Sequence, residues 1–155
     1  LAAYAAAALE PRAAAKALKY LSKAVDKETA SLDSKTFEKH WLVLVEAERA
    51  ARAIGGALCV FCKSGKDRTG MAVTLAAAMF VGEAATSPDD DEALMLDRAN
   101  ALREHGVRVR ICEKNTGRKK YAFNVIQREF LPFPYRPPMS TIEDLLSSTI
   151  HRDTS

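Results

Sequence analysis

One short segment, residues 62–70, restricts the fold of this chain more than any other. Its sequence, Cys-Lys-Ser-Gly-Lys-Asp-Arg-Thr-Gly, places five residues between a cysteine and an arginine. Apolar residues 57–61 precede it and a helix-forming run at 71–80 follows it. A loop that joins a strand end to a helix N-terminus collects backbone N–H groups and the positive end of the helix dipole. The order of strand, loop and helix therefore predicts an anion-binding loop.

Three side chains of this loop are predicted to be catalytic. Cys62 stands at the expected strand end, where a helix N-terminus and nearby cations lower a cysteine pKa from roughly 8.5 to about 3.5–7.5, so we expect a thiolate. Arg68 offers a planar fork that binds two phosphoryl oxygens at once. Thr69 can donate its hydroxyl to the thiolate. Together they predict nucleophilic attack on phosphorus.

The remaining loop residues are predicted to bind phosphate. Gly65 allows a positive φ angle that turns backbone N–H groups inward. Lys63 and Lys66 add more positive charge than one phosphate needs, which indicates a substrate with several phosphates. Ser64 completes this predicted phosphate-binding set. A nucleotide-binding Walker A loop is excluded because Asp67, and not Ser or Thr, follows Gly65-Lys66.

The loop resembles that of the cysteine-based phosphatases, and its sequence is similar to the inositol polyphosphate 4-phosphatases. Residues 118–124 and 135–138 also resemble the C-terminal end of the eukaryotic 4-phosphatases, and the whole resemblance covers about residues 55–138, with a weaker interval at 82–100. It implies a catalytic C-terminal region that removes the 4-phosphate of phosphatidylinositol 3,4-bisphosphate through a phosphocysteine intermediate. It also implies that no metal or other cofactor takes part.

The leaving inositol hydroxyl has a high pKa, so a general acid is expected to protonate it. Asp67 is the nearest carboxyl group in the sequence, and myotubularin-like lipid phosphatases place an Asp similarly. Asp33, well upstream, is the alternative, by similarity to the acid loop of tyrosine phosphatases. We favour Asp67, and the sequence leaves both open.

Two other functions stay open. The chain is alternatively a phosphoinositide-binding module without catalysis, or a dual-specificity protein phosphatase. Phe61 stands where protein tyrosine phosphatases usually carry a histidine, and the two loop lysines point to a more highly charged substrate. These features favour an inositol phosphate substrate over a phosphoprotein.

The resemblance implies an α/β fold of the tyrosine-phosphatase type, with a central sheet. Only residues 57–61 and 107–112 look like strands, so we expect either a helix-rich version or a C-terminal piece whose upstream strands are missing. The predicted domains are a catalytic domain at 1–138 and a loosely held tail at 139–155. Apolar spacing and helix-ending residues predict helices at 12–25, 34–53, 71–80, 92–105 and 121–130.

Charge and hydropathy indicate the expected partners. The net charge of +3 is too small to indicate nucleic-acid binding but suits an anionic membrane surface. Lysines and arginines cluster at residues 103–128, either as a solvated face or as a contact for membrane or inositol phosphate. No apolar run is long enough to span a bilayer. We therefore expect a cytoplasmic protein, peripheral at membranes, that binds a phosphoinositide lipid or inositol polyphosphate; its oligomeric state stays open.

The cysteines argue against a disulfide framework and against a metal site. The chain has three, Cys59, Cys62 and Cys112, and a reactive thiolate requires a reducing compartment. Cys59 and Cys62 form a C-x-x-C pair, but no second ligand pair stands at a spacing suitable for zinc. We predict no metal.

Overall fold

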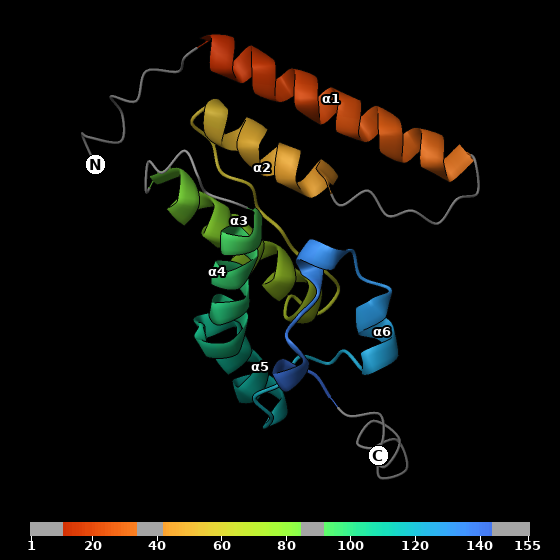
Figure 1. Ribbon diagram of the computed structural model, residues 1–155, viewed down its shortest axis with the longest axis vertical. Coiled ribbons are helices and arrows are strands. Elements are labelled where there is room, and N and C mark those ends of the chain that lie inside the picture. Colours follow the sequence, from red (N-terminus) through yellow and green to blue (C-terminus); the bar gives the residue numbers. More distant parts are fainter. Residues whose placement is uncertain (1–10, 34–41, 85–91, 144–155) are drawn as a thin grey trace. The chain divides into compact units, whose positions relative to one another are not determined.

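The computed structural model describes residues 11–33, 42–84 and 92–143. The chain divides into two compact units, residues 1–59 and 60–155. Every regular element in the described ranges is a helix, and no β-strand occurs there (Figure 1). The predicted α/β fold of the tyrosine-phosphatase type is therefore wrong for the described chain.

The described part of the N-terminal unit contains two helices, α1 (Pro11–Asp33) and α2 (Leu42–Ala53), which lie side by side (Figure 1). Their small side chains permit a close approach, and among the described residues of this unit Ala24, Val45 and Ala50 are buried. The predicted helix at 12–25 is confirmed and extends further, because good helix formers such as Lys27, Glu28 and Ala30 continue past its expected end.

Helix α2 ends where the sequence predicted. Gly55 has a φ angle of +72°, which favours glycine, and its N–H donates to the carbonyl oxygen of Arg52 at 2.9 Å. The N–H of Gly56 donates to the carbonyl oxygen of Ala51 at 2.8 Å. The predicted start of this helix, residues 34–41, lies outside the described residues.

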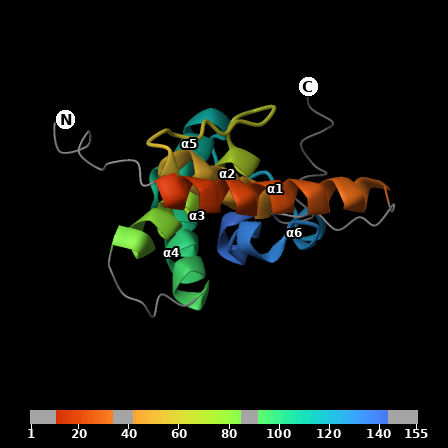
Figure 2. The same cartoon turned by 90° about the horizontal axis from the view of Figure 1, so that it is seen from above.

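The C-terminal unit is built around one long helix that follows the loop. This helix contacts the next two helices and the first of two short 3₁₀ turns. The last helix lies away from α4 in both views (Figures 1 and 2). The elements are α3 (Asp67–Ala84), α4 (Glu92–His105), α5 (Val107–Thr116), α6 (Val125–Glu129), η1 (Phe133–Tyr135) and η2 (Met139–Thr141).

Helix α3 supplies much of the core of this unit. Met71, Leu75 and Ala78 follow one another at helical spacing and are buried, with Ala99 of α4 buried as well. The predicted helices at 71–80 and 92–105 are confirmed.

A buried arginine joins the parts of this unit. The Arg103 side chain is 0% exposed and donates to the hydroxyl of Thr74 at 3.1 Å and to the side-chain oxygen of Asn100 at 2.9 Å. It also donates to the carbonyl oxygens of Pro134 at 2.6 Å and Arg136 at 3.0 Å. Burial lowers the Arg103 pKa to about 10, so the guanidinium is charged at neutral pH. Arg103 thus belongs to the core and not to a solvated or membrane-facing basic surface.

Residues 57–61 do not form the predicted buried strand. They form no regular secondary structure, and Phe61 is 81% exposed. A strand needs a partner to satisfy its backbone N–H and C=O groups, and the described residues offer none here. The segment therefore joins α2 to the loop as an exposed connection.

Residues 107–112 form the start of helix α5 and not the predicted strand. The sequence Val-Arg-Val-Arg-Ile-Cys alternates as a strand does, but Val109 and Cys112, three residues apart, are both fully buried. A helix satisfies its own backbone hydrogen bonds, so it needs no partner strand. Gly106 precedes the helix in an extended conformation, and Gly117 ends it with a φ angle of +71°.

The last predicted helix, 121–130, is shorter than expected. Asn124 caps α6: its side-chain oxygen accepts from the N–H of Gln127 at 2.8 Å, and the Gln127 side chain accepts from the N–H of Asn124 at 3.1 Å. Since this reciprocal cap fixes the start of the helix, the residues before it are free to take another conformation.

Residues 121–123 instead pair with the segment that follows η2. Tyr121 and Ile142 form an isolated parallel bridge, and the N–H of Tyr121 donates to the carbonyl oxygen of Thr141 at 2.7 Å. The N–H of Glu143 donates to the carbonyl oxygen of Phe123 at 3.0 Å. These bonds hold the described part of the predicted tail; residues 144–155 lie outside the described residues.

Candidate active site

The loop at 62–70 leads directly into α3, so its last residues form the first turn of the helix. The N–H of Gly65 donates to the carbonyl oxygen of Cys62 at 3.2 Å, which closes a turn. Gly65 has a φ angle of +67°, which confirms the predicted positive φ. A Cβ atom at Gly65 would meet no atom within 4 Å, so the backbone conformation, and not crowding, favours glycine.

Hydrogen-bond donors surround the sulfur of Cys62. The Cys62 pKa is lowered to about 6, and the largest cause is hydrogen bonding by the Thr69 hydroxyl. The backbone N–H groups of Thr69, Gly65 and Ser64 lower this pKa further, whereas partial burial raises it. The Thr69 side chain is buried, and its hydroxyl oxygen has no hydrogen-bond partner in the described part of the chain, so the hydroxyl is available to donate to the Cys62 thiolate. At neutral pH Cys62 is therefore mostly a thiolate.

Three further loop residues are exposed around this thiolate. Lys63, Ser64 and Arg68 all face solvent, and none of them forms an ion pair with a described carboxylate. Two cationic groups are thus accessible to an anion next to Cys62.

Lys66 and Asp67 are engaged with other protein groups. One oxygen of Asp67, Oδ1, accepts from the N–H of Ala122 at 2.9 Å, and Oδ2 lies 3.8 Å from Nζ of Lys66. Their side chains are only 19% (Lys66) and 15% (Asp67) exposed. Asp67 therefore ties the loop to the segment before α6. The alternative acid, Asp33, is the last residue of α1 in the other unit.

Residues far away in the sequence support the loop. Nη2 of Arg108, on α5, donates to the carbonyl oxygen of Gly65 at 2.6 Å. The Tyr121 ring lies against the helix backbone, since a Cβ atom at Gly70 would be 3.1 Å from Cε1 of Tyr121. Burial raises the Tyr121 pKa to about 12 and also raises the pKa of Cys112. No local sequence pattern could assign these roles, because the partners are long-range contacts.

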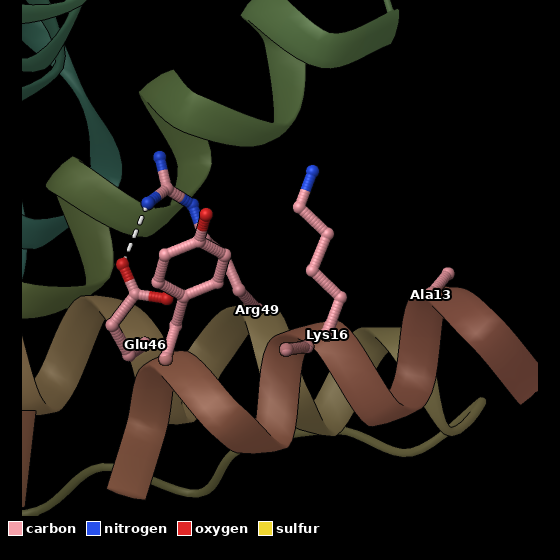
Figure 3. Close-up of a pocket in the computed structure, with 6 residues that line it drawn as sticks. Ala13, Lys16, Glu46 and Arg49 are labelled. Atoms are coloured by element: carbon pink, nitrogen blue, oxygen red, sulfur yellow. Dashed lines mark hydrogen bonds and ion pairs between the residues drawn. The ribbon is translucent and has the colours of Figure 1, made fainter. Parts of the chain in front are cut away.

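A separate cavity lies in the N-terminal unit, and none of its lining residues is a predicted site residue. Its volume is about 350 Å³, and Arg49 forms an ion pair of 2.8 Å with Glu46 beside it (Figure 3). The cavity contains no nucleophilic thiol, so it does not compete with the loop as a reaction site. It is lined by Ala13, Lys16, Ala17, Tyr20, Glu46 and Arg49.

The described ranges contain no group of three or more His, Cys, Asp or Glu residues arranged to hold a metal ion. Cys59, Cys62 and Cys112 are free thiols. In these same ranges, no helix has the length and apolar character that crossing a membrane requires.

Comparison with known proteins places most of the chain in one family. Residues 8–135 match the family described as INPP4A C-terminal domain. The chain is 36% identical over 107 residues to inositol polyphosphate 4-phosphatase type II of Homo sapiens, which covers 69% of the chain and 11% of that protein. Type II inositol 3,4-bisphosphate 4-phosphatases of Pongo abelii and Rattus norvegicus match over the same shares at 36% and 35% identity. The chain thus spans 11% of the length of these relatives. No solved structure matches the chain.

Proposed function

This chain belongs to the INPP4A C-terminal domain family, and we infer that it is the catalytic region of a metal-independent phosphoinositide phosphatase. We propose that its substrate is phosphatidylinositol 3,4-bisphosphate and that it removes the 4-phosphate. Two of the relatives are named type II inositol 3,4-bisphosphate 4-phosphatases, and these names support the proposed substrate. The observation that carries the proposal is the Cys62 thiolate, stabilised by the Thr69 hydroxyl and loop N–H groups.

The first chemical step is attack of the Cys62 thiolate on phosphorus. The S–P bond forms as the bond between phosphorus and the ring oxygen breaks, which gives a phosphocysteine. Arg68 and the loop N–H groups bind the phosphoryl oxygens, where negative charge is held in the transition state. Water then hydrolyses the S–P bond, releasing inorganic phosphate and the thiolate.

Asp67 is the proposed general acid that protonates the leaving ring oxygen. In the free protein its carboxylate faces Lys66 and the N–H of Ala122. A second substrate phosphate would attract Lys66 away and so release the Asp67 carboxyl group from this ion pair. Lys63 and Lys66 are thus the proposed contacts for the neighbouring ring phosphate, together with Ser64 and Gly65 around the reacting one.

We further propose that the protein acts in the cytoplasm, at an anionic membrane surface. Phe61 is 81% exposed, and Lys63 is also exposed, so an apolar and a cationic side chain flank Cys62. An exposed aromatic residue beside a cation suits the interface between lipid headgroups and acyl chains.

The membrane contact is tested with Phe61→Ser. This change is expected to reduce the rate on phosphatidylinositol 3,4-bisphosphate vesicles severalfold and to leave the rate on the soluble headgroup unchanged. Phe130→Ser, which removes another exposed phenylalanine, is the matched control. An equal loss on vesicle and soluble substrate would contradict a membrane role for Phe61.

A phosphoinositide-binding module without catalysis is the second candidate. Two observations favour it: no sheet supports the loop within the described chain, and Lys66 and Asp67 are paired with each other. Such a module would bind the same lipids and release no phosphate.

The deciding experiment measures phosphate release from a phosphoinositide panel and a phosphotyrosine peptide, with wild type and Cys62→Ser, in chelator and reductant. Release from the 3,4-bisphosphate that is lost in Cys62→Ser supports the proposed enzyme, and identification of the product tests the 4-position. Binding of the lipid without release favours the module. Preferred release from the peptide would favour a dual-specificity protein phosphatase.

A further inference from the structure

Arg108 reaches the loop from another helix. It lies on α5, and its Nη2 donates to the carbonyl oxygen of Gly65 at 2.6 Å. We propose that Arg108 is a positioning residue that fixes the peptide between Gly65 and Lys66 in the conformation that the phosphate-binding loop requires. Its importance for the reaction rests on the function proposed above; its effect on the loop does not.

The planar peptide bond explains how this contact acts. In a trans peptide the C=O and the following N–H point in opposite directions. Holding the Gly65 carbonyl oxygen toward α5 therefore turns the N–H of Lys66 away from α5. The same contact restrains Gly65 itself, whose N–H donates to the carbonyl oxygen of Cys62 and is one of the groups that lower the Cys62 pKa.

The backbone of Gly65 needs this restraint because glycine is conformationally free. Gly65 adopts a φ angle of +67°, and no side chain of its own limits its backbone. A glycine loop without an external contact samples several conformations, and only some of them direct the N–H groups at one point. A hydrogen bond from a charged donor is strong enough to select one of these conformations.

Helix α5 provides a rigid base for the guanidinium. Val109 and Cys112 of this helix are fully buried, which fixes its position in the unit. The Cβ atom of Arg108 lies 3.8 Å from a Cβ atom placed on Gly70, so the start of the side chain lies close to α3. The buried Nε of Arg108 has no hydrogen-bond partner in the described chain, and the bond from Nη2 is thus its link to the loop.

The test compares Arg108→Met with Arg110→Met in the full chain. Methionine keeps the apolar stem and removes the donor, and Arg110 is an exposed arginine of the same helix. The rate of Cys62 alkylation by iodoacetamide is measured against pH by peptide mass spectrometry, with the exposed Cys59 as internal reference. Steady-state phosphate release from the 3,4-bisphosphate provides kcat and KM.

For Arg108→Met we expect the alkylation midpoint to rise and kcat/KM to fall about tenfold, a change typical of losing one hydrogen bond to a charged group. Arg110→Met is expected to match wild type. An unchanged midpoint in folded Arg108→Met, or an equal shift in Arg110→Met, overturns the proposal. If Arg108→Met does not fold, Arg108→Lys decides: a raised midpoint supports the proposal and a wild-type midpoint overturns it.

The two measurements separate this proposal from the proposed function. Alkylation needs no phosphatase activity. If wild type releases no phosphate but the midpoint still rises in Arg108→Met, the proposed enzyme is wrong and the positioning role of Arg108 stands. If wild type releases phosphate but the midpoint does not move in Arg108→Met, the proposed enzyme stands and the positioning role of Arg108 is wrong.

Discussion

At the scale of single residues, hydrogen bonds make the largest contribution to stabilising the Cys62 thiolate. The largest contribution comes from the Thr69 hydroxyl, and backbone N–H groups add to it. Because hydrogen bonds stabilise the thiolate, the exposed cations Lys63 and Arg68 remain available to bind an anion. The reactivity of the thiol and the affinity for phosphate can therefore be changed by separate substitutions.

Thr69→Val is expected to raise the pKa of Cys62 above its value of about 6. One hydrogen bond is worth about 0.5–1.5 kcal/mol, which corresponds to roughly two- to tenfold less thiolate at pH values below the midpoint. Wild-type alkylation should rise through about pH 6, because protonation below this pH removes the nucleophile. Alkylation rates from pH 5 to 9 measure the shift. Thr116→Val, on α5, is the control, and a midpoint that stays at the wild-type value would contradict the role of Thr69.

Gly65→Ala is expected to destabilise the protein by about 1–2 kcal/mol, because alanine is strained at positive φ. The added methyl group has space, so the loop should keep its geometry and its reactivity. Gly117 has a similar φ angle of +71° and equally open surroundings, so Gly117→Ala is a matched control with the same expected cost. Urea unfolding measures both. A loss of Cys62 reactivity in Gly65→Ala alone would show that the loop does not tolerate the change.

At the scale of elements, Arg103 connects α3, α4 and the chain around η1 through hydrogen bonds to oxygens of five residues. These oxygens are held by one side chain, so they would lose their partner together. Arg103→Met is expected to lower the free energy of unfolding by about 3–5 kcal/mol, because buried carbonyl oxygens are left unsatisfied. Chemical denaturation checks this, with the exposed Arg110→Met expected to stay within about 0.5 kcal/mol of wild type. Similar losses in both variants would contradict the central role of Arg103.

Elements whose pattern is complete within the sequence were predicted well. The helix at 92–105 and the end of α2 at Gly55 depend on local spacing and on glycine, and both are confirmed. Residues 57–61 and 107–112 were predicted wrongly as strands. A strand depends on partners that the local sequence does not contain, and Val109 and Cys112 pack equally well at helical spacing.

At the scale of the whole molecule, the chain forms two compact units with a boundary between Cys59 and Val60. The candidate site lies entirely in the second unit. Its contacts run from the loop to α5 and to the segment before α6, through Arg108 and Asp67. The second unit thus contains every group that is proposed to act on substrate.

A chain consisting of residues 60–155 is expected to unfold cooperatively and to keep the reactive Cys62 thiol, because compact units with their own core fold independently. Urea unfolding followed by circular dichroism, together with the alkylation profile of Cys62, tests this. The full chain is the reference. A gradual transition without a plateau would show that the first unit is required for folding.

The sequence suffices to propose the residues of the candidate site, but not the long-range contacts that support the loop. Cys62, Arg68 and Thr69 are neighbours along the chain, so their chemistry and spacing suffice to predict a phosphate loop. Arg108 is 43 residues from Gly65, and its arginine-rich surroundings look like a solvated surface. Only the folded chain distinguishes the arginine that holds the loop from the arginine that faces water.

Because Cys112 is completely buried, the reaction of its thiol with a small reagent reports local opening of the structure. Two of its three thiols are accessible to solvent in the native state, and the third reacts only when α5 moves away from its neighbours. The slow rate at which a small reagent reaches Cys112 therefore measures the free energy of that opening, without any added label. Because Arg108 is on the same helix, this rate also reports how often the loop loses its support.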